Sequence, residues 1–141
     1  MNMKSLRLLV VDDHDVVRAG VRTLLARHAG FEICGEASNG LDAIQKVQSL
    51  KPDIAVVDIR MPDLDGLEVT RRIRKISPQT EVVILTMYDS SHLVEEAIRA
   101  GARGYVLKMA VGRDLAAAIE AAHKQERFVS PGVSSSESAS E

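Results

Sequence analysis

Short apolar runs alternate with amphipathic stretches along most of this chain. The runs IAVVD at 54–58 and VVILT at 82–86 are almost wholly apolar, as strands buried on both faces are. Between them, residues 67–76 repeat apolar side chains at helical spacing, so Val69, Ile73 and Ile76 are expected on the inner face of a helix and basic side chains on the other face. A buried strand followed by an amphipathic helix is the unit from which parallel α/β sheets are built.

The same unit recurs five times. Strands are expected at 6–11, 31–37, 54–58, 82–86 and 104–107, and helices at 14–27, 41–47, 67–76, 93–100 and 113–123. The pair Asn39-Gly40 is typical of a hairpin turn, but the apolar spacing after it is helical, so a helix cap at Ser38 or Asn39 is favoured. Asp65 is expected to cap the third helix, with Glu68 completing a capping box. The pattern predicts a parallel sheet covered by helices on both faces.

Length and periodicity predict one domain and a tail. The chain has 141 residues, of which 45% are hydrophobic, enough for one sizeable core. After Gln125 the periodicity ends and the chain finishes in SPGVSSSESASE, which is too polar and Ser-rich to bury itself. We therefore expect a folded domain over 1–125 and a linker over 126–141.

Charge and cysteine content narrow the function classes. A formal net charge of -2 and a pI near 6.1 give no basic excess for nucleic acid, and the basic run at 71–75 is interpreted as a solvated helix face. The single cysteine, Cys34, excludes an internal disulfide. No apolar run approaches the ~20 residues that cross a bilayer. We expect a cytoplasmic protein without direct contact to nucleic acid or membrane.

Polar side chains stand where the predicted strands end. Asp12 and Asp13 follow the first strand, Asp58 ends the third, Thr86 ends the fourth and Lys108 follows the fifth. Ligand sites of parallel sheets lie beyond the carboxyl ends of the strands, so these side chains should converge. Three clustered acids repel one another unless a hard cation such as Mg²⁺ compensates them. Asp58, on the central strand, is the favoured nucleophile toward phosphorus, with Lys108 as a positioned cation and Thr86 as a hydrogen-bond donor.

Four segments resemble, in order, the motifs of response-regulator receiver domains: VVDDH at 10–14, DIRMPDLDG at 58–66, ILTMYD at 84–89 and GARGYVLK at 101–108. The resemblance implies the flavodoxin-like (βα)5 architecture, a doubly wound five-stranded parallel sheet in the order 2-1-3-4-5. It also implies that the protein catalyses only its own phosphorylation and dephosphorylation, with Mg²⁺ as cofactor.

Site residues follow from the same resemblance. Asp58 would be the phosphoacceptor, Asp13 a direct Mg²⁺ ligand and Asp12 a ligand through water. The Arg60 backbone carbonyl would be a third protein ligand of the metal. Thr86 and Lys108 would contact the phosphoryl oxygens. Tyr105 resembles the aromatic switch residue, whose ring would turn inward when Thr86 is drawn toward the phosphoryl group.

The DDH start and the segment RFVSPGV at 127–133 resemble the NarL/FixJ type of response regulator, in which a LuxR-like helix-turn-helix domain follows the receiver. That output domain is not within these 141 residues. The resemblance implies a sensor histidine kinase as partner and control of transcription through DNA contacts of the output domain. Together with the Ala-rich segment LAAAIEAAH at 115–123, it also predicts a homodimer promoted by phosphorylation.

Three further side chains lie close in sequence to the predicted site residues: those of Arg60, Tyr88 and His14. Arg60 and Tyr88 each lie two residues past a site residue, so we predict that they tune the lifetime of the aspartyl phosphate. His14 is interpreted as a helix-start residue, because Mg²⁺ prefers oxygen ligands.

Three other functions compete with the hypothesis of a receiver domain. An Asp-nucleophile hydrolase would need a DxD motif, whereas Arg60 stands where its second acid would be. A flavin or nucleotide binder would need a phosphate cradle after the first strand, where two acids stand instead. The remaining alternative is a receiver-like interaction module that works without phosphorylation.

Overall fold

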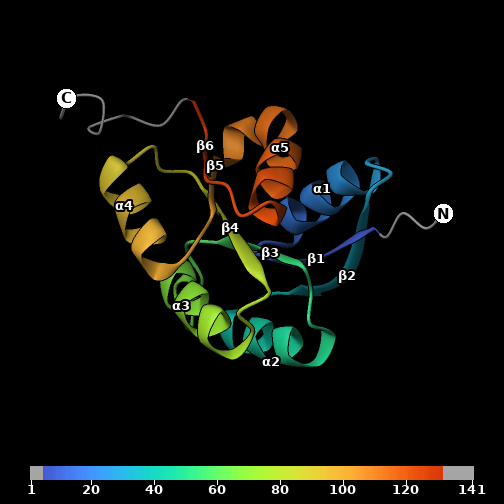
Figure 1. Ribbon diagram of the computed structural model, residues 1–141, viewed down its shortest axis with the longest axis horizontal. Helices are drawn as coiled ribbons and strands as arrows, with labels where there is room; N and C mark the ends of the chain where they lie inside the picture. The colour runs from blue at the N-terminus through green and yellow to red at the C-terminus, as the bar shows by residue number, and fades with distance from the viewer. Residues whose placement is uncertain (1–4, 132–141) are drawn as a thin grey trace.

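Six parallel strands form one sheet in the computed structural model, which describes residues 5–131 (Figure 1). The strands are β1 (Leu6–Val11), β2 (Phe31–Ala37), β3 (Ile54–Asp58), β4 (Glu81–Thr86), β5 (Gly104–Leu107) and β6 (Phe128–Val129). Their order is β2-β1-β3-β4-β5-β6, and every neighbouring pair is parallel. The predicted order of the first five strands is confirmed, but the predicted number was wrong, because β6 extends the sheet beyond β5.

Helices cover both faces of the sheet, as predicted (Figure 1). They are α1 (Asp15–Ala26), α2 (Gly40–Leu50), α3 (Gly66–Ile76), α4 (Ser91–Ala100) and α5 (Val111–His123), with a short 3-10 helix η1 at Lys108–Ala110. Helices α1 and α5 pack on one face, and α2, α3 and α4 pack on the other. No helix of residues 5–131 has the length and apolar character needed to cross a bilayer.

Alternation along each strand divides the core into two layers. On β1, Leu8 and Val10 pack toward α1 and α5, whereas Leu9 and Val11 pack toward α2 and α3, and all four are at most 1% exposed. Successive side chains of a strand point to opposite faces, so a strand buried on both faces must be apolar throughout. Burial on both faces explains the unbroken apolar runs of the sequence. It also holds in place the strand ends that carry the polar side chains.

Two helix starts have the predicted N-caps, but the Glu68 carboxylate accepts hydrogen bonds from Arg71 and Arg72 and does not complete the predicted capping box. The Asn39 side chain accepts a hydrogen bond from the Asp42 N–H at 2.8 Å, and the Asp65 side chain accepts one from the Glu68 N–H at 2.9 Å. Such caps satisfy backbone donors that the first helical turn leaves free. A second expectation on α3 was also wrong: Ile76, at the end of the helix, is 41% exposed rather than part of its inner face.

The segment after α5 departs from the expected linker over 126–141. Phe128 and Val129 pair with β5 instead, and Ser130 is buried with its hydroxyl donating to Asp114 Oδ2 at 2.8 Å and accepting from the Leu107 N–H at 3.1 Å. Backbone pairing and this buried hydroxyl give the segment an anchor that its composition does not reveal. The rest of the predicted linker, 132–141, lies outside the described residues.

Candidate functional site

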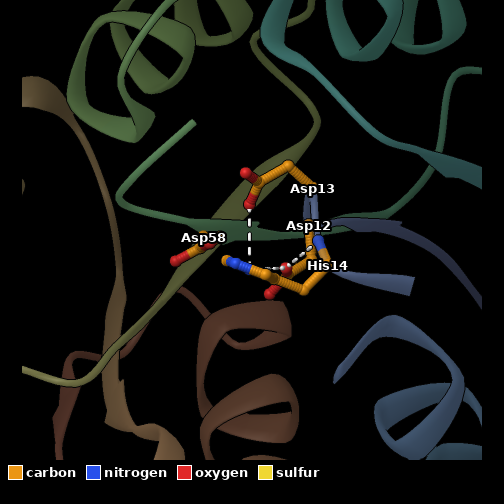
Figure 2. Close-up of side chains that lie close together, drawn as sticks. All are labelled: Asp12, Asp13, His14 and Asp58. Carbon is orange, nitrogen blue, oxygen red and sulfur yellow. Dashed lines mark hydrogen bonds and ion pairs between the residues drawn. The ribbon is translucent and has the colours of Figure 1, made fainter. Parts of the chain in front are cut away.

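The carboxyl ends of β1 and β3 bring three acids together. Asp58 is the last residue of β3 and 3% exposed, and Asp12, directly after β1, is fully buried. Figure 2 shows Asp12, Asp13, His14 and Asp58 grouped at this edge of the sheet. One ligand atom of each of these four residues lies within 4.8 Å of the others. The predicted convergence of Asp12, Asp13 and Asp58 is therefore found in the structure.

Lys108 supplies the positive charge of the site. It follows β5, and its Nζ lies 3.1 Å from Asp12 Oδ2 and 3.3 Å from Asp58 Oδ1. The Lys108 side chain is 16% exposed, so this contact is largely shielded from water. One ammonium facing three carboxylates leaves an excess of negative charge, which the protein keeps in a poorly solvated position.

Three carboxylate oxygens of the site are buried and have no hydrogen-bond donor within residues 5–131: Asp12 Oδ2, Asp13 Oδ1 and Asp58 Oδ2. The first two lie near Lys108 and His14, but these contacts lack hydrogen-bond geometry. Buried acceptors without partners are costly, and a group of carboxylates with ligand atoms within 4.8 Å of one another is a donor set that a hard divalent cation takes. The residues present therefore fit Mg²⁺.

Burial decides the protonation behaviour of Asp58. Loss of solvation raises the pKa of its carboxyl group, the charge of Asp12 raises it further, and Lys108 opposes both. A cation in the cluster would favour the ionised form. A positive charge at this position would therefore favour the ionised carboxylate, the form of the group that can act as a nucleophile.

Gly66 fixes the backbone that carries Asp58. A Cβ atom at Gly66 would lie 2.4 Å from the Asp58 carbonyl oxygen and 2.7 Å from Ile59 Cα, which no side chain tolerates. The Gly66 N–H also donates to the Ile59 carbonyl at 2.8 Å. The loop after β3 therefore folds back tightly onto the strand end, and the Asp58 side chain is held on a rigid backbone.

Thr86 and Tyr105 are joined through the loop after β4. Thr86 is fully buried, and its hydroxyl accepts a hydrogen bond from the Tyr88 N–H at 3.0 Å. The Tyr105 hydroxyl donates to the Tyr88 carbonyl at 2.8 Å, and its ring is 1% exposed. Burial raises the pKa of Tyr105. The two residues thus hold the same peptide segment from its two sides.

Arg60 and Tyr88 form a contact beside the acids. The Arg60 guanidinium lies over the Tyr88 ring, with its carbon 5.0 Å from the ring centre. A cleft of about 360 Å³ opens next to them, lined by Ile59, Arg60, Met61, Asp65, Leu67, Tyr88 and Leu93. The contact between the two side chains therefore joins the loop after β3 to the loop after β4.

His14 is the N-cap residue of α1, which confirms its interpretation as a helix-start residue, although its side chain makes no capping hydrogen bond. Its ring lies instead against the acids, with Nδ1 3.1 Å from Asp13 Oδ1 and 3.4 Å from Asp12 Oδ1. The adjacency in VVDDH is the only sequence signal for this contact. Gly66 was likewise not singled out, although it lies within DIRMPDLDG.

The comparisons with known proteins agree with this geometry. The family described as "Response regulator receiver domain" matches residues 8–120. The chain is 36% identical over 128 residues to the response regulator GacA of Pseudomonas viridiflava and 36% identical over 129 residues to the response regulator protein VraR of Staphylococcus aureus. These alignments cover 91% and 92% of this chain but only 60% and 62% of the relatives.

Among solved structures, the chain is similar to a two-component response regulator of the LuxR family from Aurantimonas sp. SI85-9A1. The TM-score is 0.91 at 35% identity, over 98% of this chain and 100% of that one. The chain thus spans about three fifths of the length of the curated relatives, and the remaining part of those relatives has no counterpart in it.

Proposed function

The chain belongs to the response-regulator receiver family, in its NarL/FixJ-type branch, and we propose that it accepts a phosphoryl group on Asp58 with Mg²⁺ beside it. The observation that carries this proposal is the meeting of Asp58, Asp12, Asp13 and Lys108 at one end of the sheet, with three buried carboxylate oxygens left without a donor. A nucleophile, a cation site and a fixed ammonium are the parts that phosphoryl transfer needs.

In the proposed reaction, a carboxylate oxygen of Asp58 forms a bond to phosphorus while the bond from phosphorus to the donor's leaving group breaks. The donor is the phosphohistidine of a sensor kinase, whose imidazole nitrogen leaves with the electron pair. Lys108 and Thr86 would face the phosphoryl oxygens, where positive charge and hydrogen-bond donors stabilise charge that builds up in transfer. Beyond this self-phosphorylation and the return hydrolysis, no turnover of an external substrate is proposed.

The metal would be held by Asp13 directly, by Asp12 through water, by Asp58 and by the backbone carbonyl of Arg60. When bound, Mg²⁺ supplies charge that offsets the repulsion between carboxylates and phosphoryl oxygens. The Arg60 N–H lies 3.4 Å from Asp58 Oδ1, so the same peptide segment borders the acceptor carboxylate.

Switching would start at Thr86. The Thr86 hydroxyl holds the Tyr88 N–H, and the Tyr88 carbonyl holds the Tyr105 hydroxyl, so a shift of Thr86 toward a phosphoryl oxygen changes both bonds. A phosphoryl group acts only through contacts that differ between two arrangements of this loop. Tyr105 would then report the change on β5, next to α4 and α5.

Arg60 and Tyr88 are proposed to set the lifetime of the aspartyl phosphate. Both side chains line the cleft formed by the loops that follow Asp58 and Thr86, and a water molecule that hydrolyses the acyl phosphate would approach past them. The pair would restrict the approach of water, so loss of either side chain should change the rate of dephosphorylation.

The output would be transcription, in the cytoplasm, through a LuxR-type helix-turn-helix domain in the part of the relatives that this chain does not span. This chain itself would not contact DNA, since its formal net charge is -2. Phosphorylation would promote a homodimer. Sedimentation that is unchanged by an aspartyl phosphate would contradict the dimer.

The test is intact mass spectrometry after incubation with acetyl phosphate, with and without Mg²⁺. Gain of one phosphoryl group only in the presence of Mg²⁺ supports the proposal. No gain by a folded protein would instead favour the alternative, a receiver-like interaction module that works without phosphorylation.

A further inference from the structure

The His14 imidazole lies inside the acidic cluster rather than on the outer face of α1. Figure 2 shows its ring among the side chains of Asp12, Asp13 and Asp58. Its Nδ1 lies 3.1 Å from Asp13 Oδ1 and 3.4 Å from Asp12 Oδ1, and the His14 backbone N–H donates to Asp12 Oδ1 at 2.8 Å. The backbone hydrogen bond therefore holds His14 beside Asp12, and the ring lies within contact distance of both carboxylates.

The distances around His14 match the edges of a coordination sphere. Ligand atoms that lie about 2.1 Å from a metal and at right angles to each other are roughly 3.0 Å apart. The Nδ1 to Asp13 Oδ1 separation of 3.1 Å is close to such an edge. A cation held by Asp13 would accordingly reach the nitrogen without movement of the backbone.

A second observation points to a ligand. Asp12 and Asp58 are at least 97% buried, and each keeps one carboxylate oxygen without a donor among the residues that the structure describes. The His14 side chain is 65% exposed, so one side of its ring borders water. The cluster thus combines buried oxygen acceptors with one accessible nitrogen.

We propose that His14 is a nitrogen ligand of the metal at this site and that it makes the site bind divalent transition ions such as Co²⁺, Ni²⁺ and Zn²⁺ preferentially over Mg²⁺. Imidazole nitrogen suits these ions, whereas Mg²⁺ prefers oxygen and gains little from it. Phosphoryl acceptance would then depend on which divalent ion occupies the cluster. This inference rests on the metal site proposed above for Asp12, Asp13 and Asp58.

Co²⁺ and Mg²⁺ are the probes for the test, with calorimetry of each ion at a fixed pH of about 8, where an ordinary imidazole is neutral. We expect His14→Ala to weaken Co²⁺ binding about tenfold or more and to change Mg²⁺ binding by about twofold or less. His14→Asn, which retains a favourable helix cap, should behave in the same way. His92→Ala is the matched control, because His92 is exposed on α4 beside Glu96.

Paramagnetic proton NMR of the Co²⁺ protein reports ligation directly. Ring protons of a bound imidazole shift far outside the ordinary range, and we expect these signals in the wild type and in His92→Ala but not in His14→Ala. Co²⁺ binding that needs Asp13 but is indifferent to His14, without such shifted protons, would overturn the inference while leaving the magnesium site intact. If Asp13→Asn changes the binding of neither ion, the proposed metal site itself fails, and the role of His14 fails with it.

Discussion

Lys108 Nζ lies 3.3 Å from Asp58 Oδ1, a contact that reaches from the end of β5 across β4 to the end of β3. The parallel arrangement of the strands makes this contact possible, because it places all their carboxyl ends at one edge. The ammonium offsets only part of the charge, since Asp12 and Asp13 stand beside Asp58. The site is therefore built to hold more negative charge than the protein alone neutralises.

Asp58→Asn should stabilise the metal-free protein at neutral pH by about 1–2 kcal/mol. Burial and Asp12 raise the pKa of Asp58 above its ordinary value of 3.8, so the folded protein binds a proton more tightly there than the unfolded chain. Ionisation of Asp58 therefore lowers the free energy of unfolding as pH rises from 3.8 through the raised pKa of the folded protein. At higher pH this loss of stability stays constant. Urea unfolding at several pH values measures the effect.

The stability gained by Asp58→Asn should shrink as pH falls through this range. Below it, the wild-type carboxyl group is neutral in both the folded and the unfolded protein. Saturating Mg²⁺ should stabilise the wild type more than Asp58→Asn, because the ion binds the ionised carboxylate. A destabilised Asp58→Asn protein at neutral pH would contradict the account of charge crowding.

Tyr105→Phe should cost about 0.5–1.5 kcal/mol, the net value of one hydrogen bond. The change removes the bond from the Tyr105 hydroxyl to the Tyr88 carbonyl and leaves the ring in place. Amide hydrogen exchange at residues 87–90 should become faster in Tyr105→Phe. Tyr88→Phe is the control, because the hydrogen bonds found for Tyr88 within residues 5–131 are made by its backbone N–H and carbonyl, not by its hydroxyl. Equal effects of both changes would argue against the coupling.

Arg60→Ala and Tyr88→Ala should each change the first-order rate of aspartyl phosphate hydrolysis severalfold. Each substitution removes one of the two side chains that contact each other at the cleft between the loops after β3 and β4. Loss of phosphoryl label after removal of the donor provides the rate. Arg71→Ala, on the outer side of α3, serves as the control for loss of an arginine. Unchanged rates in both site variants would end the proposal for these two residues.

Ser130→Ala should destabilise the domain by about 1–3 kcal/mol, because it leaves the buried Leu107 N–H without its acceptor and removes a donor to Asp114. Urea unfolding gives the free energy. Ser49→Ala is the control, since Ser49 is exposed on α2, and its cost should stay within about 0.5 kcal/mol. If the two variants cost the same, Ser130 does not anchor β6.

The sequence was sufficient to predict the five main strands and the meeting of the acids, because both depend on apolar runs and on parallel topology. Asp12, Asp13 and Asp58 converge since each stands at a strand end. The sixth strand could not be predicted: a pair of residues, Phe128 and Val129, carries no periodicity and depends on the free edge of β5.

The direction of individual side chains is the second feature that the sequence pattern alone does not predict. The sequence and the structure both place His14 at a helix start, but only the structure shows that its ring turns toward Asp13. The link from Tyr105 to the Tyr88 carbonyl depends on how the loop after β4 is folded, which no spacing predicts. Gly66 similarly matters because its backbone lies against Asp58.

The most direct test of the central claim locates the phosphoryl group. The protein is treated with acetyl phosphate and Mg²⁺ and then with borohydride, which reduces an aspartyl phosphate to homoserine, and peptide mass spectrometry identifies the changed position. We predict homoserine at position 58 only, and none in a sample prepared without Mg²⁺. Homoserine at position 12 or 13, or at 58 irrespective of Mg²⁺, would contradict the assignment of Asp58 as the metal-dependent phosphoacceptor.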